Sequence, residues 1–238
     1  MTDSKYIGRE LDLFADVRNW KQYWAQQIRP YLAGDVLEVG AGIGANTPFL
    51  NAARRGRWVC LEPDPQLAAQ ITTNLSAALR QPPRETICGT LQTLDPGQQF
   101  DSIVYIDVLE HIEHDGEELI RAAALLRPEG HLIVLSPAHQ WLYTPFDAAI
   151  GHYRRYNRAM IKNISPPSLQ VEKLVYLDSV GLTASLANRV LLRQSMPTQA
   201  QLRFWDQRLI PLSRVLDRIF RFGIGKTVLA VWRKPAGD

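Results

Sequence analysis

The segment 35–47 constrains the fold of this chain more than any other feature. Its apolar run 35–39 is followed by Gly40, Gly42 and Gly44, at every second position, and then by residues that suit a helix start. A strand that turns through glycine into a helix lets a ligand approach the bare backbone. The helix N-terminus adds unpaired N–H groups and a partial positive charge. The segment therefore predicts a binding site for a polar, nucleotide-like ligand.

The glycine pattern by itself leaves the ligand open. Residues 40–45 satisfy the dinucleotide pattern G-x-G-x-x-G/A, and Glu62 stands about 20 residues further on, where such sites carry an acid. An NAD-binding oxidoreductase is therefore one hypothesis. Glu38 argues against it, because a carboxylate beside the glycines would repel a pyrophosphate but could orient the loop around a cationic ligand. The block 100–112, which contains Asp107, also argues against it.

Five blocks of the chain occur together in a recognisable order: 36–44, 61–64, 89–91, 107–112 and 126–132. With them the chain resembles the class I S-adenosylmethionine-dependent methyltransferases, over roughly residues 35–137. The element Gly-His-x-Arg-Arg-Tyr at 151–156 resembles a bacterial subgroup of that family. The resemblance implies S-adenosyl-L-methionine as the cofactor and S-adenosyl-L-homocysteine as the product.

Apolar runs and helically spaced segments alternate along the chain. Strands are predicted at 35–39, 57–61, 85–88, 101–106, 131–135, 170–177 and 226–233. Helices are predicted at 13–32, 45–54, 65–80, 116–126 and 157–164, with two more in 180–222. This alternation implies right-handed crossovers and a parallel sheet. The resemblance implies an α/β, Rossmann-like fold: a seven-stranded, mostly parallel sheet with helices on both faces, an antiparallel last strand, and a helical insertion between strands 6 and 7.

The length of 238 residues predicts a single domain, 1–238. We divide it into an N-terminal helical cap, a core, a helical insertion and a last strand with its tail: 1–34, 35–178, 179–224 and 225–238. No run approaches the ~20 apolar residues of a membrane span and the N-terminus lacks a signal-peptide pattern, so we expect a cytoplasmic protein. Cys60 and Cys88 are predicted as apolar fillers of buried strands, and the net charge of +3 does not indicate nucleic-acid binding.

The resemblance places the cofactor at the carboxyl ends of the strands. The residues expected to bind it are Glu38, Gly40, Ala41, Gly42, Gly44, Asn46, Thr47, Glu62, Pro63, Thr90, Leu91, Asp107 and Val108. Glu62 would accept hydrogen bonds from both ribose hydroxyls, since a carboxylate offers only acceptors. Asp107 would lie near the methionine amino group and the transferred methyl. For Thr90 and Leu91 an ordinary turn is the alternative.

The pattern D-x-x-E-H at 107–111 raises the question of a metal. Some class I O-methyltransferases carry E-x-x-E-H here with a distant histidine, and bind a divalent cation that activates a hydroxyl. The matching set in this chain would be Asp107, Glu110, His111 and His152. Many relatives with Leu-Glu-His at this point use no metal, and Glu110 could simply cap the following helix. The favoured expectation is therefore no metal, with Mg²⁺ as the alternative.

The aromatic and basic stretch 136–157 is predicted to be a long functional loop on the acceptor side of the cleft. The substrate candidates in it are His139, Tyr143, His152, Arg154, Arg155 and Tyr156. His152 or His139 could act as general base, because imidazole titrates near neutrality. The catalytic candidates are His111, His152 and Asp107. Arg154 or Arg155 could bind a phosphate or carboxylate, unless Asp147 pairs with one of them and pins the loop.

The insertion is the most basic part of the chain. Between Val180 and Lys226 there are eight basic residues and two acids, Asp206 and Asp217. Its second helix, within 198–222, mixes apolar residues with arginines, so a membrane surface is one possible partner. We favour a helix packed on the sheet edge, or a dimer contact, in a monomer or homodimer. Pro211 should kink or divide this helix.

These features together predict an enzyme that transfers a methyl group to a small-molecule acceptor. The histidines and D-x-x-E-H favour a hydroxyl acceptor, hence O-methylation. The arginines favour an anionic metabolite, such as a sugar or lipid intermediate bearing phosphate. The alternatives are an NAD-binding oxidoreductase and a non-catalytic nucleotide-binding or membrane-peripheral protein.

Overall fold

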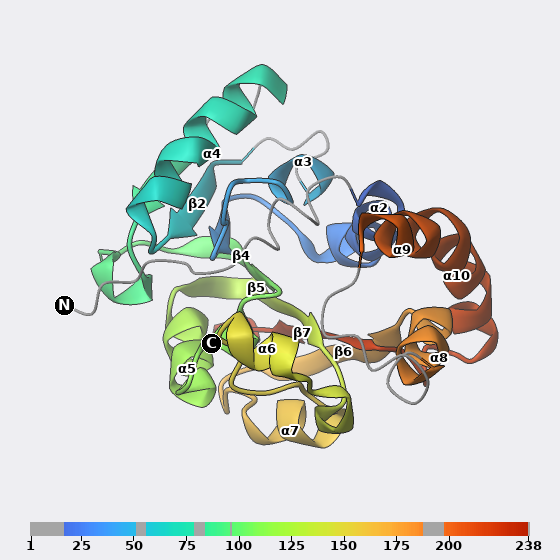
Figure 1. Ribbon diagram of the computed structural model, residues 1–238. Coiled ribbons are helices and arrows are strands. Elements are labelled where there is room, and N and C mark those ends of the chain that lie inside the picture. The colour runs from blue at the N-terminus through green and yellow to red at the C-terminus, as the bar shows by residue number, and fades with distance from the viewer. Residues whose placement is uncertain (1–16, 51–55, 79–83, 96, 188–197, 238) are drawn as a thin grey trace.

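The computed structural model describes residues 17–50, 56–78, 84–95, 97–187 and 198–237. They form one seven-stranded sheet in the order β3-β2-β1-β4-β5-β7-β6 (Figure 1). The strands are β1 (Val36–Val39), β2 (Trp58–Glu62), β3 (Arg84–Cys88), β4 (Phe100–Ile106), β5 (Leu126–Pro137), β6 (Gln170–Leu177) and β7 (Thr227–Arg233). Strands β1 to β5 pair in parallel, and β7 runs antiparallel to both of its neighbours. The predicted fold class is confirmed.

Helices cover both faces of the sheet. The described ones are α2 (Arg18–Ile28), α3 (Thr47–Leu50), α4 (Pro65–Ala78), α5 (Asp115–Ala124), α6 (Pro145–Ala149), α7 (Arg158–Asn163), α8 (Ser179–Ala187), α9 (Gln199–Phe204) and α10 (Ile210–Ile219). Residues of α5 and α7 share one core with alternate residues of the strands. Residues of α2, α4, α9 and α10 share the other, on the opposite face. Alternation along the strands supplies both cores, because successive side chains point to opposite faces.

Two segments differ from the sequence prediction. Strand β5 begins at Leu126, not near residue 131, because residues 127–130 bulge out between the pairs Phe100–Leu126 and Ser102–His131. The predicted Pro-Glu-Gly turn is this bulge, with Glu129 at φ 67°. Cys88 is exposed, so its predicted burial is wrong; β3 is an edge strand with β2 as its neighbour. Cys60, in the more central β2, is buried as expected.

The insertion between β6 and β7 is helical, as predicted, but holds three α-helices, α8, α9 and α10, where two helices were expected. A π-helical turn, η6 (Trp205–Leu209), joins α9 to α10 immediately before Pro211. Proline lacks the N–H that an α-helix would pair one turn back, and the wider turn absorbs this break. In Figure 1, α2, α9 and α10 lie together on one side of the molecule, away from α4. Among the described residues no helix is long and apolar enough to cross a membrane.

The N-terminal helix is tied to the insertion by a carboxylate. Asp206 accepts hydrogen bonds from the backbone N–H groups of Arg18, Asn19 and Trp20, at 2.9–3.2 Å. These are orphan donors of the first turn of α2, so Asp206 caps that helix from a distant segment of the chain. The helix predicted at 13–32 is thus present from residue 18, and its first residues lie outside the described part of the chain.

Candidate functional site

The glycine loop after β1 has the backbone that its sequence requires. Gly40, Gly42 and Gly44 have φ values of +63°, +57° and +78°, a region that side chains disfavour. A Cβ atom at Gly40 would also come within 2.6 Å of a methyl carbon of Val108. Glycine is needed there both for the turn and for the close approach of the chain that follows β4.

Two buried acids brace this loop. Glu38 accepts a hydrogen bond from the Thr47 hydroxyl at 2.7 Å and one from the Trp58 indole at 3.0 Å, which fixes the start of α3. Glu62 accepts from the N–H of Gly42 at 2.8 Å and from that of Asp64 at 3.0 Å. Asp64 in turn caps α4, accepting from the N–H of Gln66 at 2.7 Å. Glu38 and Glu62 therefore stabilise the conformation of the glycine loop by hydrogen bonds.

A cavity of about 310 Å³ lies against the loop, within the ~300–1,000 Å³ range of ligand sites. Several segments line it: the glycine loop, the end of β4, the helix α2, the loop after β5, the turn that contains Glu110 and His111, the helix α8, η6 and the start of β7. The lining residues from the first two are Gly40, Ala41, Gly42, Ile43, Ala45, Asn46, Ile106 and Asp107. Lys21 of α2 also lines it and donates a hydrogen bond to the Ala45 carbonyl at 3.3 Å. The cavity thus lies at the carboxyl edge of the sheet, where open α/β folds bind ligands.

Asp107 ends β4 in the left-handed region, at φ 55°. Its side chain is exposed and lines the cavity. The many protein atoms around the carboxyl group partly desolvate it, and this desolvation raises the pKa of Asp107 to about 6, although the positive charges of His152, Lys226 and Lys21 oppose the rise. Strained backbone of this kind clusters at ligand-binding sites, which suits a residue that lines the cavity.

The loop after β5 holds a second group of interacting side chains. Asp147, from α6, is fully buried and lies 3.0 Å from His152 Nδ1 and 2.9 Å from two nitrogens of Arg155. Burial would raise the pKa of Asp147, but the hydrogen bonds from His152 and Arg155 outweigh it and hold that pKa well below its usual range. Because the ionised carboxylate only accepts, Nδ1 of His152 carries the proton. A neutral His152 then has its lone pair on Nε2.

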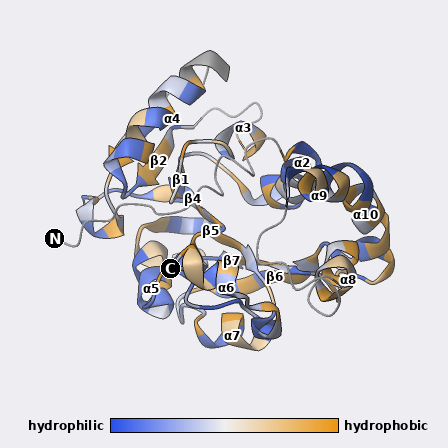
Figure 2. Ribbon diagram, in the orientation of Figure 1, coloured by the Kyte–Doolittle hydropathy of each residue, from blue (hydrophilic) through white to orange (hydrophobic). Residues whose placement is uncertain are grey.

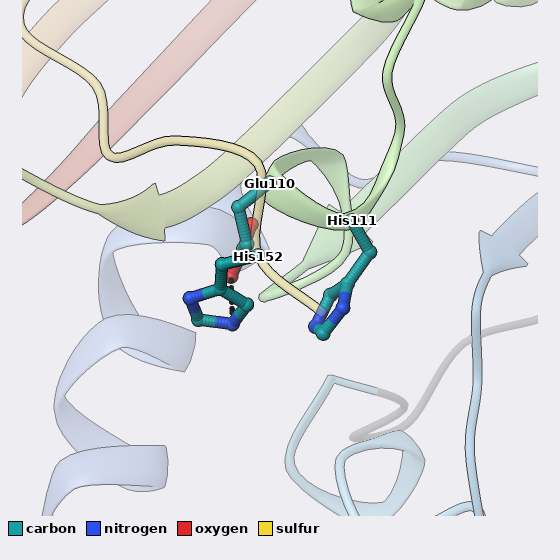
Figure 3. Close-up of side chains that lie close together, drawn as sticks. All are labelled: Glu110, His111 and His152. Carbon is teal, nitrogen blue, oxygen red and sulfur yellow. Dashed lines mark ion pairs between the residues drawn. The ribbon is translucent and has the colours of Figure 1, made fainter. Parts of the chain in front are cut away.

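The Nε2 side of His152 faces Glu110 and His111 (Figure 3). Nε2 lies 3.9 Å from Glu110 Oε1, and the rings of His152 and His111 meet edge to face with centroids 4.5 Å apart. Burial and the nearby Asp107 raise the pKa of Glu110 well above its usual value. Burial and the charge of His152 lower the pKa of His111 to about 4, so His111 is neutral near pH 7. All three residues line the cavity.

Glu110, His111 and His152 also have the geometry of a metal site. One ligand atom from each lies within 4.8 Å of the others. Both carboxylate oxygens of Glu110 are buried and lack a hydrogen-bond partner within the described part of the chain. The set therefore fits a divalent cation by donor type and spacing, but Asp107, the fourth member of the predicted set, does not belong to this cluster.

Four of the substrate candidates from the sequence have structural partners and do not line the cavity. Arg154 pairs with Asp115 at 2.7 Å. Tyr156 is buried and donates to Asp115 at 2.8 Å. Tyr143 donates to the His152 carbonyl at 2.5 Å. His139 lies 2.9 Å from the Gly225 carbonyl through Nε2. Arg155 does line the cavity, but its guanidinium is held by Asp147, which is the loop-pinning alternative.

Several cofactor candidates also lie outside the lining of this cavity. They are Glu38, Gly44, Thr47, Glu62, Pro63, Thr90, Leu91 and Val108. Leu91 is buried and Thr90 precedes the 3-10 turn η2 (Leu91–Thr93). Conversely, the sequence reading did not single out Lys21 or Lys226, both of which line the cavity. The available signal was the position of Lys21 next to Trp20 and close to Trp24. Its side chain is buried, which is rare for a lysine unless the ammonium group has a partner.

Residues 37–132 match the family described as "Methyltransferase domain". A ubiquinone biosynthesis O-methyltransferase of Rhodopseudomonas palustris (strain HaA2) is 30% identical over 97 residues, which are 36% of this chain and 38% of that protein. The matched region therefore spans about two fifths of that relative's length.

Solved methyltransferases share the fold over nearly the whole chain. A putative sarcosine dimethylglycine methyltransferase from Galdieria sulphuraria aligns with a TM-score of 0.60 at 16% identity, over 91% of this chain and 86% of that one. The N-methyltransferase NodS from Bradyrhizobium japonicum WM9, in complex with S-adenosyl-L-homocysteine, aligns with a TM-score of 0.59 at 14% identity, over 98% and 94%. Residues 37–132 of this chain therefore match a methyltransferase domain, and the described fold is shared with solved methyltransferases.

Proposed function

We propose that the chain catalyses methyl transfer from S-adenosyl-L-methionine to a hydroxyl of a small-molecule acceptor, with His152 as the general base. One observation carries the proposal: a histidine oriented by a buried carboxylate lines the same cavity as the glycine loop. The similarity to ubiquinone biosynthesis O-methyltransferases supports an oxygen acceptor.

The cavity lining suits the cofactor's charges. The bare backbone of Gly40 and Gly42 gives room for its methionine portion and ribose. Asp107 would pair with the ammonium group, and Lys21 with the carboxylate. Glu62, Thr90 and Leu91 lie outside this lining, and their roles follow from the family resemblance. Glu62 would accept from the ribose hydroxyls, since each of its oxygens keeps a lone pair beyond the one used by the loop. Thr90 and Leu91 would contact the adenine.

In this proposal His152 removes the proton from the acceptor hydroxyl. Bound S-adenosyl-L-methionine supplies an activated methyl sulfonium and becomes S-adenosyl-L-homocysteine after transfer. Nε2 of His152 takes the proton of the acceptor hydroxyl, whose oxygen then forms the new bond to carbon. Asp147 holds the ring and stabilises the imidazolium that results. Arg155 and Lys226 line the cavity beside their partners Asp147 and Asp178, and their cationic groups would bind a phosphate or carboxylate on the acceptor.

We expect this reaction to proceed without a metal. Glu110, His111 and His152 could hold Mg²⁺, which would supply Lewis-acid activation of the hydroxyl. However, the raised pKa of Glu110 favours its neutral form, which attracts a dication weakly. Dialysis against EDTA should therefore leave the rate of S-adenosyl-L-homocysteine formation unchanged. Loss of activity on chelation, restored by Mg²⁺, would contradict this.

Cofactor binding should weaken as the pH falls through the pKa of Asp107. Above about pH 6 Asp107 is ionised and attracts the ligand's ammonium group; below it the carboxyl is neutral. Affinity for S-adenosyl-L-homocysteine should drop about tenfold between about pH 7 and pH 5, as the ionised fraction of Asp107 drops. Calorimetric titration at each pH checks this. The variant Asp107→Asn should bind weakly at both pH values, and an equally steep pH dependence in that variant would assign it to another group.

The direct test of the proposed function is calorimetric titration with S-adenosyl-L-homocysteine, with NAD as the control. Saturable binding of the former alone is the expected result, followed by a screen of hydroxyl acceptors for product release. Binding of NAD alone would overturn the proposal. Binding of S-adenosyl-L-homocysteine without turnover of any acceptor would favour a non-catalytic nucleotide-binding protein.

A further inference from the structure

The outward face of the insertion helix is apolar. Phe204, Leu212, Val215 and Ile219 are 58%, 55%, 59% and 66% exposed, and we call them the outer stripe. Leu212, Val215 and Ile219 follow each other at intervals of three and four residues, so they lie on one side of α10. Figure 2 shows hydrophobic and hydrophilic residues interleaved along this helix. Single exposed apolar residues are ordinary, but a continuous row of them marks an interaction site.

The inward face of the insertion helices buries polar residues beside apolar ones. Trp205 and Ile210 pack in the core of that face. Asp206, Ser213 and Asp217 are buried. Asp206 caps α2, and Asp217 accepts from the N–H groups of Asp178 and Ser179 at 2.7 and 2.9 Å, where α8 begins. Ser213 donates to Asp178 at 2.6 Å. Hydrogen bonds to buried carboxylates therefore hold much of this helix in place, and much of its apolar surface remains outside.

The exposed charged side chains between residues 198 and 224 are all basic. The acids between residues 198 and 224 are Asp206 and Asp217, and both are buried beneath the helix. The arginines of the same span that are exposed are Arg203, Arg208, Arg218 and Arg221. The outer stripe is thus flanked by cations without compensating surface acids in that span. An apolar row with basic flanks matches the boundary between acyl chains and anionic headgroups.

We propose that the outer stripe and its arginines dock the protein on an anionic lipid bilayer. A two-fold contact with a second copy is the less suitable occupant, because it would bring arginine-rich flanks of the two copies together. The docked helix also borders the cavity, since Trp205, on η6 between α9 and α10, lines it. Docking would therefore hold the cavity beside the bilayer surface.

Vesicle sedimentation tests the proposal. The full chain should bind phosphatidylglycerol vesicles and not phosphatidylcholine vesicles, and added salt should weaken binding. Val215→Glu should weaken binding more than about tenfold, because it removes apolar contact and adds a repelled charge. Arg208→Gln and Arg218→Gln should each weaken it about fivefold. The matched control is Val171→Glu, which makes the same change at a residue 47% exposed on β6 and should bind like the wild type.

Binding of S-adenosyl-L-homocysteine, measured on each variant, should be unchanged, which shows that the variants fold and separates this inference from the proposed function. Equal binding to both kinds of vesicle, or binding unaffected by Val215→Glu, would overturn the proposal. Absence of vesicle binding would overturn it too. A dimer of the wild type that Val215→Glu dissociates, measured by sedimentation velocity, would then assign the outer stripe to a second copy.

Discussion

Replacement of Asp217 by alanine is expected to lower the free energy of unfolding by about 3–5 kcal/mol, and the melting temperature by about 6–20 °C. The carboxylate is fully buried and accepts from the Tyr23 hydroxyl at 2.7 Å and from the N–H groups of Asp178 and Ser179. Burial and the proximity of Asp217 raise the pKa of Tyr23, which keeps its phenol protonated as a donor. Alanine would leave these buried donors without an acceptor, a cost that water does not offset.

The substitution should also disturb the cavity. Asp217, on α10, holds α2 and the start of α8 by hydrogen bonds, and residues of α2 line the cavity. Scanning calorimetry measures the effect, with Val215→Ala as the control on the exposed side of the same helix. The control should melt near the wild type. Asp217→Asn, which keeps one acceptor oxygen, should fall between the wild type and Asp217→Ala. A melting temperature of Asp217→Ala equal to that of the wild type would show that water or other groups replace the carboxylate.

The sequence predicts the sheet well, because strand patterns depend on neighbouring residues. The strand expected at 170–177 is β6 with the same bounds, and the insertion follows it as predicted. The orientation of α10 could not be predicted in the same way. Its apolar residues show that the helix has faces, but which face lies inward depends on Asp206 and Asp217. Their partners are up to 188 residues away along the chain.

The residues of the candidate site also fall into two groups: those that the sequence predicts and those whose partners depend on the folded structure. The glycine loop and Asp107 could be recognised because strand, turn and helix follow each other directly in the sequence. The sequence left open which arginine Asp147 holds and which histidine faces the cavity. Asp147 selects Arg155 and His152, both brought close by α6 and the turn at Gly151. Such choices follow from side-chain geometry in the folded loop and leave no periodic pattern.

His152→Ala is expected to lower kcat by roughly 10²–10⁴-fold while binding of S-adenosyl-L-homocysteine stays unchanged. The reason is that we propose Nε2 of His152 as the proton acceptor, and alanine leaves the glycine loop and the Asp107 side chain in place. The rate is measured as S-adenosyl-L-homocysteine released with the acceptor found by screening. His139→Ala is the control, since that ring bonds to the Gly225 carbonyl and does not line the cavity. Its kcat should remain close to that of the wild type.

Asp147→Asn refines the same test, because it alters the orientation of His152 and leaves the imidazole present. An amide can donate to Nδ1, which would move the ring proton to Nε2 and remove the base. The variant should therefore lose much of the rate that His152→Ala loses, provided that calorimetry shows it folded, since Asp147 also holds Arg155 and caps α6. Full activity of a folded Asp147→Asn, together with loss in His152→Ala, would show that His152 acts without its carboxylate. Full activity of both would point to an acceptor that needs no base, such as a neutral amine.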